Sequence, residues 1–478
     1  MFMTGFECET HLRFATLELV RGEWRTYNYA LNLKGDAPAQ GKMDISVVNI
    51  EENAGQVPVN YVLPPGVTRI IDPGQSQITQ FNEQAMSLKV TDLQSGDARA
   101  VYKNSGMDMR TYKRLQMFVH AEKLIDDKTN LRDGDVSVFL RLGSDSKSNY
   151  YEYEVPLSLT EPGNYSTYNA QDQEAVWPQS NMFDFPLSLF TDLKLERNAK
   201  KRMDNSTVTF QTRYSSYDPD KNQNKVTIVG NPSLSDVRTM MIGVRNNSNA
   251  AKDIVVWVNE MRLTDFDQSG GWAAKANVNL GLSDIATLNI AGHVETVGFG
   301  GIDQSLTERR LDDYYQYNIA TMVELGRFLP EKVKLKAPLF YSITEQRTSP
   351  KYNPLDQDIL LKDALDNAGS KAERDSISDA SIEKSTVESF SLSGVSFDIR
   401  SKNPMPYDPA NFSISYSYNR QSKQDPTTEF ENTYDYRGSF TYSYTPFVKP
   451  FVPLKGLKSK SKHCLLYTSP SPRDSTSS

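Results

Sequence analysis

The stretch FENTYDYRGSFTYSYT, residues 430–445, decides the fold class of this chain. Aromatic and polar side chains alternate along it at nearly every second residue. The aromatic set comprises Phe430, Tyr434, Tyr436, Phe440, Tyr442 and Tyr444, and the polar set includes Glu431, Asp435, Arg437, Ser439 and Ser443. Because successive side chains of a β-strand point to opposite faces, this period of two predicts a strand with one apolar face and one polar face.

The same alternation recurs toward the N-terminus, at residues 272–282, 286–295, 315–325, 332–343 and 412–419. A further strand is expected over 389–400, where a slip of phase at Gly394 predicts a β-bulge. Strands of about ten residues are long for a soluble sheet, in which about five or six residues is usual. That length suits strands that cross a bilayer, with one face toward lipid and the other toward a wet lumen.

The alternation assigns candidate residues to each face. The candidate lumen-facing residues are Lys275, Asn277, Asn279, Thr287, Asn289, His293, Ser413, Ser415, Ser417, Asp435 and Arg437. The candidate lipid-facing residues are Val278, Leu280, Leu288, Ile290, Tyr434, Tyr436, Phe440 and Tyr442. A soluble antiparallel sheet with one wet face would give the same pattern and is the alternative.

The first half of the chain shows shorter strands separated by turns, which predicts a jelly-roll-like β-sandwich. Its best helix candidate is Phe185–Met203. The expected fold is therefore all-β, a sandwich followed by part of a large antiparallel transmembrane β-barrel. The expected segments are a β-rich lead-in (1–110), the sandwich (111–265), barrel strands (266–346), a charged, partly helical loop insertion (347–386), further barrel strands (387–463) and a non-native tail (464–478).

Both ends of the sequence are unusual. The first residues lack the basic and apolar regions of a signal peptide. The run CLLYTSPSPRD, which starts at Cys464, looks like a translated sequencing adapter. The sequence is therefore expected to be an internal fragment of a longer protein, and the two cysteines, Cys8 and Cys464, do not indicate a disulfide framework.

The sequence shows few patterns that would indicate a catalytic or cofactor-binding site. The four histidines (His11, His120, His293 and His463) show no metal-ligand spacing. The run DPDKNQN, which begins at Asp218, lacks the glycine and glutamate of a calcium loop. A net charge of −7 without a basic cluster disfavours nucleic-acid binding. We expect no enzyme activity, no metal and no cofactor.

Several long stretches resemble the SprA family of gliding-motility proteins of Bacteroidetes. They include GNPSLSDVRTMMIGVRN (230–246), VVWVNEMRLTDFDQSGGWAAKANVNLGLSD (255–284), GFGGIDQSLTERRLDDYYQYNIATMVELGRFLPEK (298–332) and YNPLDQDILLKDAL (352–365). They occur in the family's order, and the resemblance covers most of residues 112–444.

The resemblance implies an outer-membrane translocon of type IX secretion. Its cargo would be secreted proteins with a C-terminal sorting domain, and its partners would be other outer-membrane components of that system. The alternative is a soluble carbohydrate-binding or adhesion sandwich at the cell surface. The segment VVWVNEMRL, which contains Trp257, resembles the closing strand of galactose-binding jelly rolls and favours that alternative weakly.

Overall fold

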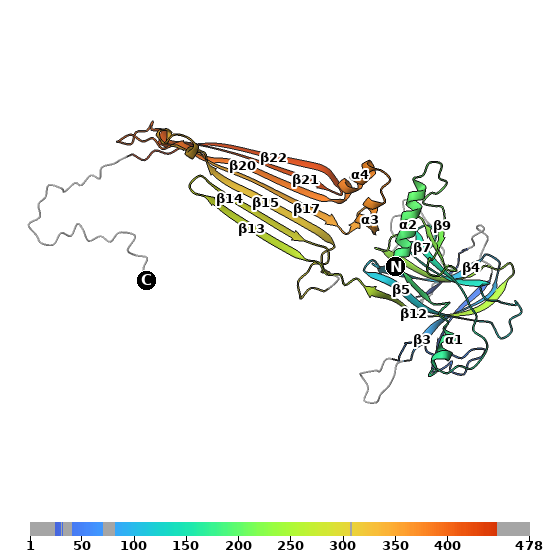
Figure 1. The fold of residues 1–478 in the computed structure, drawn as a ribbon. Helices are drawn as coiled ribbons and strands as arrows, with labels where there is room; N and C mark the ends of the chain where they lie inside the picture. Colours follow the sequence, from blue (N-terminus) through green and yellow to red (C-terminus); the bar gives the residue numbers. More distant parts are fainter. Residues whose placement is uncertain (1–23, 30, 32–40, 70–81, 306–307, 447–478) are drawn as a thin grey trace, which may run out of the picture.

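The computed structural model describes residues 24–29, 31, 41–69, 82–305 and 308–446. Cys8, Cys464 and the tail 464–478 lie outside the described residues. The predicted all-β class is confirmed, since the paired strands form antiparallel sheets. Figure 1 shows two regions, a compact β-sandwich and a long sheet that extends away from it.

The sandwich consists of a seven-stranded sheet and a five-stranded sheet. The larger sheet has the order β1 (Arg25–Tyr27), β4 (Ala98–Met107), β11 (Val237–Asn246), β6 (Val136–Gly143), β7 (Tyr150–Pro156), β10 (Lys225–Val229) and β9 (Tyr214–Tyr217). The smaller sheet has the order β2 (Lys42–Asn49), β3 (Gln84–Leu93), β12 (Lys252–Phe266), β5 (Tyr112–Glu122) and β8 (Phe183–Pro186).

The alternation of the sandwich strands explains its core. In β5, Leu115, Met117 and Val119 all join the main buried cluster. In β6, Val138 and Leu140 do the same from the other sheet. One face of each sheet therefore meets the other in a closed hydrophobic core, as expected for a β-sandwich.

The sandwich begins earlier in the chain than the expected segment 111–265. Strands β1 to β4 lie within residues 1–110, expected as a separate lead-in, yet β4 pairs with β11 and β3 pairs with β12. Within the described residues, the sandwich thus extends from Arg25 to Phe266. The pairing partners are far apart in sequence, so local alternation does not indicate them.

Two helices pack on the sandwich. Helix α1 (Ala170–Val176) begins at Asn169, whose side chain accepts a hydrogen bond from the backbone N–H of Gln171. Helix α2 (Ser188–Lys201) corresponds to the helix predicted over Phe185–Met203. Phe185 itself belongs to β8, because it pairs with Leu115 of β5.

The long sheet, hereafter the strand wall, has seven strands in order and a short strand β16 (Leu335–Lys336) beside β20. The seven are β13 (Ala273–Leu282), β14 (Ala286–Glu295), β15 (Asp312–Glu324), β17 (Pro338–Pro350), β20 (Glu383–Phe397), β21 (Phe412–Asp425) and β22 (Thr428–Tyr442). Among the described residues, β13 pairs only with β14 and β22 only with β21, so the sheet is not closed into a barrel.

The bulge predicted at Gly394 is present. The register between β20 and β21 shifts between Leu392 and Val395. Gly394 has φ +63°, a conformation that residues with a side chain rarely adopt. Its N–H donates to the Ser415 hydroxyl at 2.8 Å, which anchors the bulge to β21.

The connections of the wall contain short elements. At the end away from the sandwich lie three 3-10 turns, η2 (Leu325–Phe328), η3 (Glu331–Val333) and η4 (Pro409–Asn411). The segment expected as a loop insertion, 347–386, holds β18 (Tyr352–Asn353), β19 (Asp356–Leu360), α3 (Leu361–Asp366) and α4 (Lys371–Ser381). It connects β17 to β20 on the side of the sandwich, where Figure 1 shows α3 and α4.

Candidate functional site

The register of the strand wall divides the candidate residues between two faces. Pairs such as Asn279–Asn289 and Ser417–Arg437 place the candidate lumen-facing residues on one face. Pairs such as Leu280–Leu288 and Tyr418–Tyr436 place the candidate lipid-facing residues on the opposite face. We call these the polar face and the apolar face. What each face contacts stays a prediction at this point.

The polar face is rich in small, uncharged hydrogen-bonding side chains. One row across it joins Asn279, Asn289, Ala320, Ser342, Ser389, Asn419 and Asp435. Charged candidates are few, and Arg437 and Asp435 lie on the same strand two residues apart. Met322, Phe340 and Val387 interrupt the polar pattern. Such a surface binds water well.

His293 lies on the polar face, as expected. Its Nε2 is 3.0 Å from a carboxylate oxygen of Glu295, and its ring meets Tyr314 edge-on. Glu295 also accepts from Arg310 at 2.7 Å. The imidazole is thus part of a surface ion-pair group at the sandwich end of the wall.

The apolar face is open over its whole width. Leu280 of β13 has 48% of its surface exposed, Ile290 of β14 has 40%, and Phe440 of β22 has 65%. Single exposed apolar residues are ordinary, but these belong to adjacent strands of one face. Within the described residues, no second layer covers them, in contrast to the core of the sandwich.

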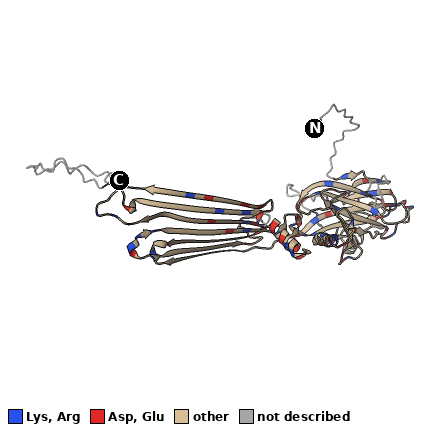
Figure 2. Cartoon of the chain, turned by 90° about the horizontal axis from the view of Figure 1, so that it is seen from above, with Lys and Arg blue, Asp and Glu red and all other residues tan. Residues whose placement is uncertain are grey.

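Charges are sparse on the strands and gather at the ends of the wall, as Figure 2 shows. At the sandwich end, Lys384 pairs with Glu345 at 3.3 Å. At the other end, Lys336 pairs with Asp398 at 3.0 Å. Two charged residues, Glu388 of β20 and Arg420 of β21, lie on the apolar face away from the strand ends, where they pair with each other in register.

A second feature joins the wall to the sandwich. The hairpin formed by β18 and β19, hereafter the docking hairpin (residues 352–360), leaves the end of β17 and inserts two carboxylates against α2. Lys194 of α2 is fully buried and forms ion pairs with both Asp356 and Asp358, the latter at 2.8 Å. It also donates to the carbonyl of Pro232 at 2.8 Å.

The buried carboxylate of Asp358 has partners on both oxygens. One oxygen contacts Lys194, and the other accepts from the Tyr151 hydroxyl at 2.5 Å and from the Leu234 N–H at 3.3 Å. Burial, together with the nearby Asp358, raises the pKa of Tyr151. Desolvation also raises the pKa of Asp356, although Lys194 opposes it. The hairpin thus depends on a satisfied, buried ionic contact.

Weaker contacts surround this junction. Lys351 donates to Asp267 at 2.8 Å, and this hydrogen bond is the main reason that the pKa of Asp267 falls to about 2. Arg110 donates to the Gln357 carbonyl at 2.8 Å and stacks over the ring of Tyr352. Arg202 pairs with Glu373 of α4 at 2.8 Å. The sandwich and the wall are therefore held together at several points.

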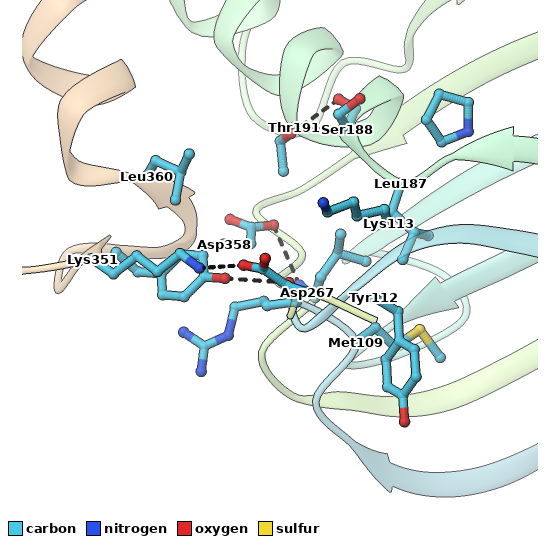
Figure 3. Close-up of a pocket in the computed structure, with 14 residues that line it drawn as sticks. Met109, Tyr112, Lys113, Leu187, Ser188, Thr191, Asp267, Lys351, Asp358 and Leu360 are labelled. Carbon is cyan, nitrogen blue, oxygen red and sulfur yellow. Dashed lines mark hydrogen bonds and ion pairs between the residues drawn. The ribbon is translucent and has the colours of Figure 1, made fainter. Parts of the chain in front are cut away.

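A cavity of about 430 Å³ lies within this junction. Figure 3 shows it between the docking hairpin and the sandwich, with Lys351 and Asp267 joined across it. Leu187, Ser188 and Thr191 line it from the start of α2, and Lys113 lines it from β5. Four of its polar lining residues, Asp267, Lys351, Tyr352 and Asp358, already make contacts of the junction.

The residues considered for other ligands have structural partners. Trp257, in the segment that resembles a galactose-binding strand, is fully buried against His120 and Trp177, so it is not available to stack on a sugar. Asp218 accepts from the Tyr153 hydroxyl at 2.6 Å, and Asn224 donates to the same hydroxyl at 2.9 Å. Among the described residues, no group of His, Cys, Asp or Glu side chains is placed to hold a metal ion.

Sequence reasoning missed the junction altogether. Lys194 and Asp358 are separated by 164 positions, and the sequence shows no feature that links them. The only local indication is that Asp356 and Asp358 alternate with Gln357 and Ile359, which is a pattern of a short strand.

Comparison with known protein families gives a match over most of the chain. A family model described as motility related/secretion protein, SprA_N, matches residues 1–365. A search of curated proteins finds no match. Of the helices that the structure describes, none has the length and apolar character needed to cross a membrane.

Proposed function

Since the chain belongs to the SprA_N family of motility-related and secretion proteins, we propose that its strand wall is part of a protein-conducting channel in the bacterial outer membrane. This channel would serve type IX secretion and gliding motility. The family is one of motility and secretion rather than of enzymes, and a place in the cell envelope fits it. The chain's role is then structural.

One observation carries the proposal: the apolar face is continuous across seven adjacent strands and is uncovered. In β21, Ile414 is 57% exposed, and in β22, Tyr436 is 64% exposed. A water-soluble sandwich would bury such a face against a second sheet, as the N-terminal region does. Lipid is the environment in which an open apolar face of this size is stable.

The polar face would line the conduit. Serine, threonine and asparagine side chains keep their water and present few fixed charges, so a folded protein could slide past them. The cargo would be secreted proteins with a C-terminal sorting domain, and transport would be passive along this surface. Gating would come from other outer-membrane components of the same system.

The described strands cannot form the channel without further strands. The outer edges of β13 and β22 have no strand partner in the described residues, and unpaired backbone groups cannot stay in hydrocarbon. We therefore expect additional strands on both edges, from the same longer chain. The sandwich, held by the docking hairpin, would lie at one mouth of the conduit.

Two lysine substitutions at neighbouring positions test the proposal. Leu288 and Asn289 are consecutive in β14 and lie on opposite faces. In the full-length protein, Leu288→Lys would place a charge in lipid, at a cost of about 2–4 kcal/mol near the bilayer midplane. Asn289→Lys would place the same charge in the wet conduit at little cost. We expect Leu288→Lys to lower the amount of folded protein in the outer membrane several-fold and Asn289→Lys to leave it unchanged.

The readouts are heat-modifiable mobility of outer-membrane fractions and export of a cargo protein. If both variants assemble equally well, the apolar face does not contact lipid and the proposal is wrong. If the protein fractionates with soluble proteins, or if Leu288→Lys only disrupts an oligomer in solution, a soluble surface module is the better account.

A further inference from the structure

We propose that a cavity on the sandwich binds a small zwitterion, an alkyl chain with an ammonium group at one end and a carboxylate at the other. The cavity lies on the outer face of the five-stranded sheet, the face that does not pack against the seven-stranded sheet. Glu122 of β5 would pair with the ammonium group, and Lys89 of β3 would pair with the carboxylate. The site is separate from the strand wall, so it does not depend on the proposed function.

The cavity has a volume of about 400 Å³, within the range of about 300–1,000 Å³ that is usual for small-molecule sites. Val255, near the start of β12, lies on its floor, whereas the end of β12 leads toward the wall. Ser46 of β2 and Ser87 of β3 add hydroxyl groups, and Gln56 adds an amide from the loop that follows β2. The cavity is therefore lined by several strands of one sheet and by a loop above them.

One row of directly paired residues crosses the floor of the cavity. Lys89 pairs with Val255, and Val255 pairs with Glu122. Their neighbours Val256 and Ala121 belong to the main core, so the row itself faces away from the core. At ~4.8 Å per strand, the backbones at Lys89 and Glu122 are roughly 10 Å apart. The row thus presents a cation, an apolar side chain and an anion in sequence, which matches a carboxylate, an alkyl chain and an ammonium group.

The carboxylate of Glu122 is the feature that requires a ligand most. Glu122 is only 2% exposed, and its Oε2 has no hydrogen-bond partner. A buried charged oxygen without a donor is costly, so most such groups are paired with protein, water or a ligand. Lys89 lines the same cavity but is exposed. The buried carboxylate therefore lies at the floor of the cavity, and the cation lies where a ligand enters.

His120 supplies a second acceptor beside Glu122. Its Nδ1 donates to the carbonyl of Val176 at 2.8 Å, so Nε2 of the neutral ring carries a lone pair. Nε2 lies 3.8 Å from Oε2 of Glu122, too far for a hydrogen bond, and it too has no partner. An ammonium group has three donors and can satisfy both atoms, whereas a hydroxyl has only one donor. The pair therefore favours an amine over an alcohol.

The rim of the cavity suits an alkyl chain. Val47 is 54% exposed, Val57 is 67% exposed and Ile125 is 69% exposed, and all three line the cavity. Apolar side chains around a few placed polar groups are typical of a ligand site. Methylene groups that lie over Val255 would cover part of this rim and leave the two charged ends of the ligand at Glu122 and Lys89.

Two kinds of molecule carry this chemistry. One is a free ω-amino acid. The other is a polypeptide that ends in lysine, because its side-chain ammonium group and its terminal carboxylate are joined by a similar alkyl chain. Both would make the same contacts with Glu122 and Lys89, so affinity has to distinguish them.

Isothermal titration calorimetry of the full-length protein, extracted into detergent, tests the site with 6-aminohexanoate, hexylammonium and hexanoate. We expect 6-aminohexanoate to bind most tightly and hexanoate most weakly. Glu122→Gln should weaken both amines at least tenfold, because it removes a buried charged acceptor. Lys89→Met should weaken 6-aminohexanoate about threefold, since an exposed pair contributes little, and should leave hexylammonium unchanged. Glu161→Gln and Lys128→Met, at exposed positions outside the cavity, are the matched controls.

The proposal is overturned if 6-aminohexanoate does not bind, if hexanoate binds as tightly, or if Glu122→Gln keeps the original affinity. A buried water would then satisfy Glu122 and His120. Denaturant unfolding shows whether Glu122→Gln is folded. If it is not, the exposed Lys89→Met variant decides, because equal weakening of 6-aminohexanoate and hexylammonium, or no weakening of either, excludes the zwitterion. An acetylated tripeptide that ends in lysine and binds more tightly than 6-aminohexanoate assigns a polypeptide ligand, and weaker binding assigns the free amino acid. None of these results alters the test of Leu288→Lys in the wall.

Discussion

The sandwich and the strand wall are built from the same alternating strands, but their apolar faces are covered differently. Ile254 of β12 in the sandwich has no exposed surface, whereas Ile290 of β14 in the wall has 40%. In the sandwich, the apolar face of each sheet packs against the apolar face of the other sheet. In the wall, no described residue covers the apolar face. Alternation along a strand therefore specifies two faces, but it does not specify what will cover the apolar one.

The two regions also differ in where they place charge. The sandwich buries an ionic group in which Glu152 contacts Arg141 at 2.5 Å and Arg245 at 3.2 Å. These guanidinium groups outweigh desolvation and lower the pKa of Glu152. On the wall, charges are sparse along the strands and gather mainly at its two ends, although Glu388 and Arg420 lie within strands on the apolar face. A water-soluble core can hold paired ions among backbone and side-chain partners, whereas a lipid-facing surface must exclude them.

The largest expected effect is at the junction of the two regions. Lys194→Met would leave the carboxylates of Asp356 and Asp358 buried without their cation. Breaking a buried ion pair costs about 3–5 kcal/mol. We expect the docking hairpin to detach, which limited proteolysis within residues 352–360 and denaturant unfolding of the chain would both detect.

Lys200→Met is the matched control, since Lys200 lies on the same helix and pairs with Glu196 at 3.0 Å on the surface. Exposed pairs of this kind contribute roughly 0–1 kcal/mol. Equal losses of stability in the two variants would show that the hairpin is not held by the buried lysine.

The next effect compares one residue type in the two regions. Ile254→Ala removes fully buried methyl groups from the sandwich core, and such changes cost about 2–5 kcal/mol. Ile290→Ala on the wall removes partly exposed groups, so in the absence of lipid we expect about 1 kcal/mol or less. Denaturant unfolding of the full-length protein, extracted into detergent, measures both. A loss at Ile290 as large as that at Ile254 would mean that the apolar face has a protein cover.

The division of each wall strand into a polar and an apolar side follows from alternation along the strand, because it depends on neighbouring residues alone; what each face contacts stays a prediction. The phase slip at Gly394 predicted the bulge for the same reason: the backbone there needs one extra residue on β20. Pairing between residues that are far apart in the sequence could not be predicted in this way. The joining of β3 to β12 and of Lys194 to Asp358 depends on three-dimensional packing, and no local pattern reports it. What packs against the apolar face likewise depends on the surroundings of the wall, so the sequence of the strands does not specify it.

The bulge offers a smaller test within the wall. Gly394→Ala would force a residue with a side chain into the left-handed region, which costs about 1–2 kcal/mol. Gly438→Ala on β22 is the control, because Gly438 has an ordinary backbone conformation and open space at its Cβ position. Unfolding of the two variants in detergent should differ by about 1 kcal/mol. If the two variants are equally stable, the bulge is not fixed at Gly394.

The smallest effect concerns pH at the junction. The hydrogen bond from Lys351 lowers the pKa of Asp267 to about 2, below its value of about 3.9 in an unfolded chain. A depressed pKa in the folded state means that the ion pair stabilises the fold above about pH 4 and that this contribution is lost as the pH falls toward 2. Because both side chains are partly exposed, the effect should be at most about 1 kcal/mol. Asp267→Asn should remove this part of the pH dependence of unfolding between about pH 4 and pH 2. The loss of stability caused by Lys194→Met, in contrast, should still be seen at neutral pH. A variant with the unaltered pH profile would show that the link between β12 and the wall does not use this pair, and the docking hairpin would then be the main ionic contact that holds the sandwich at the mouth of the wall.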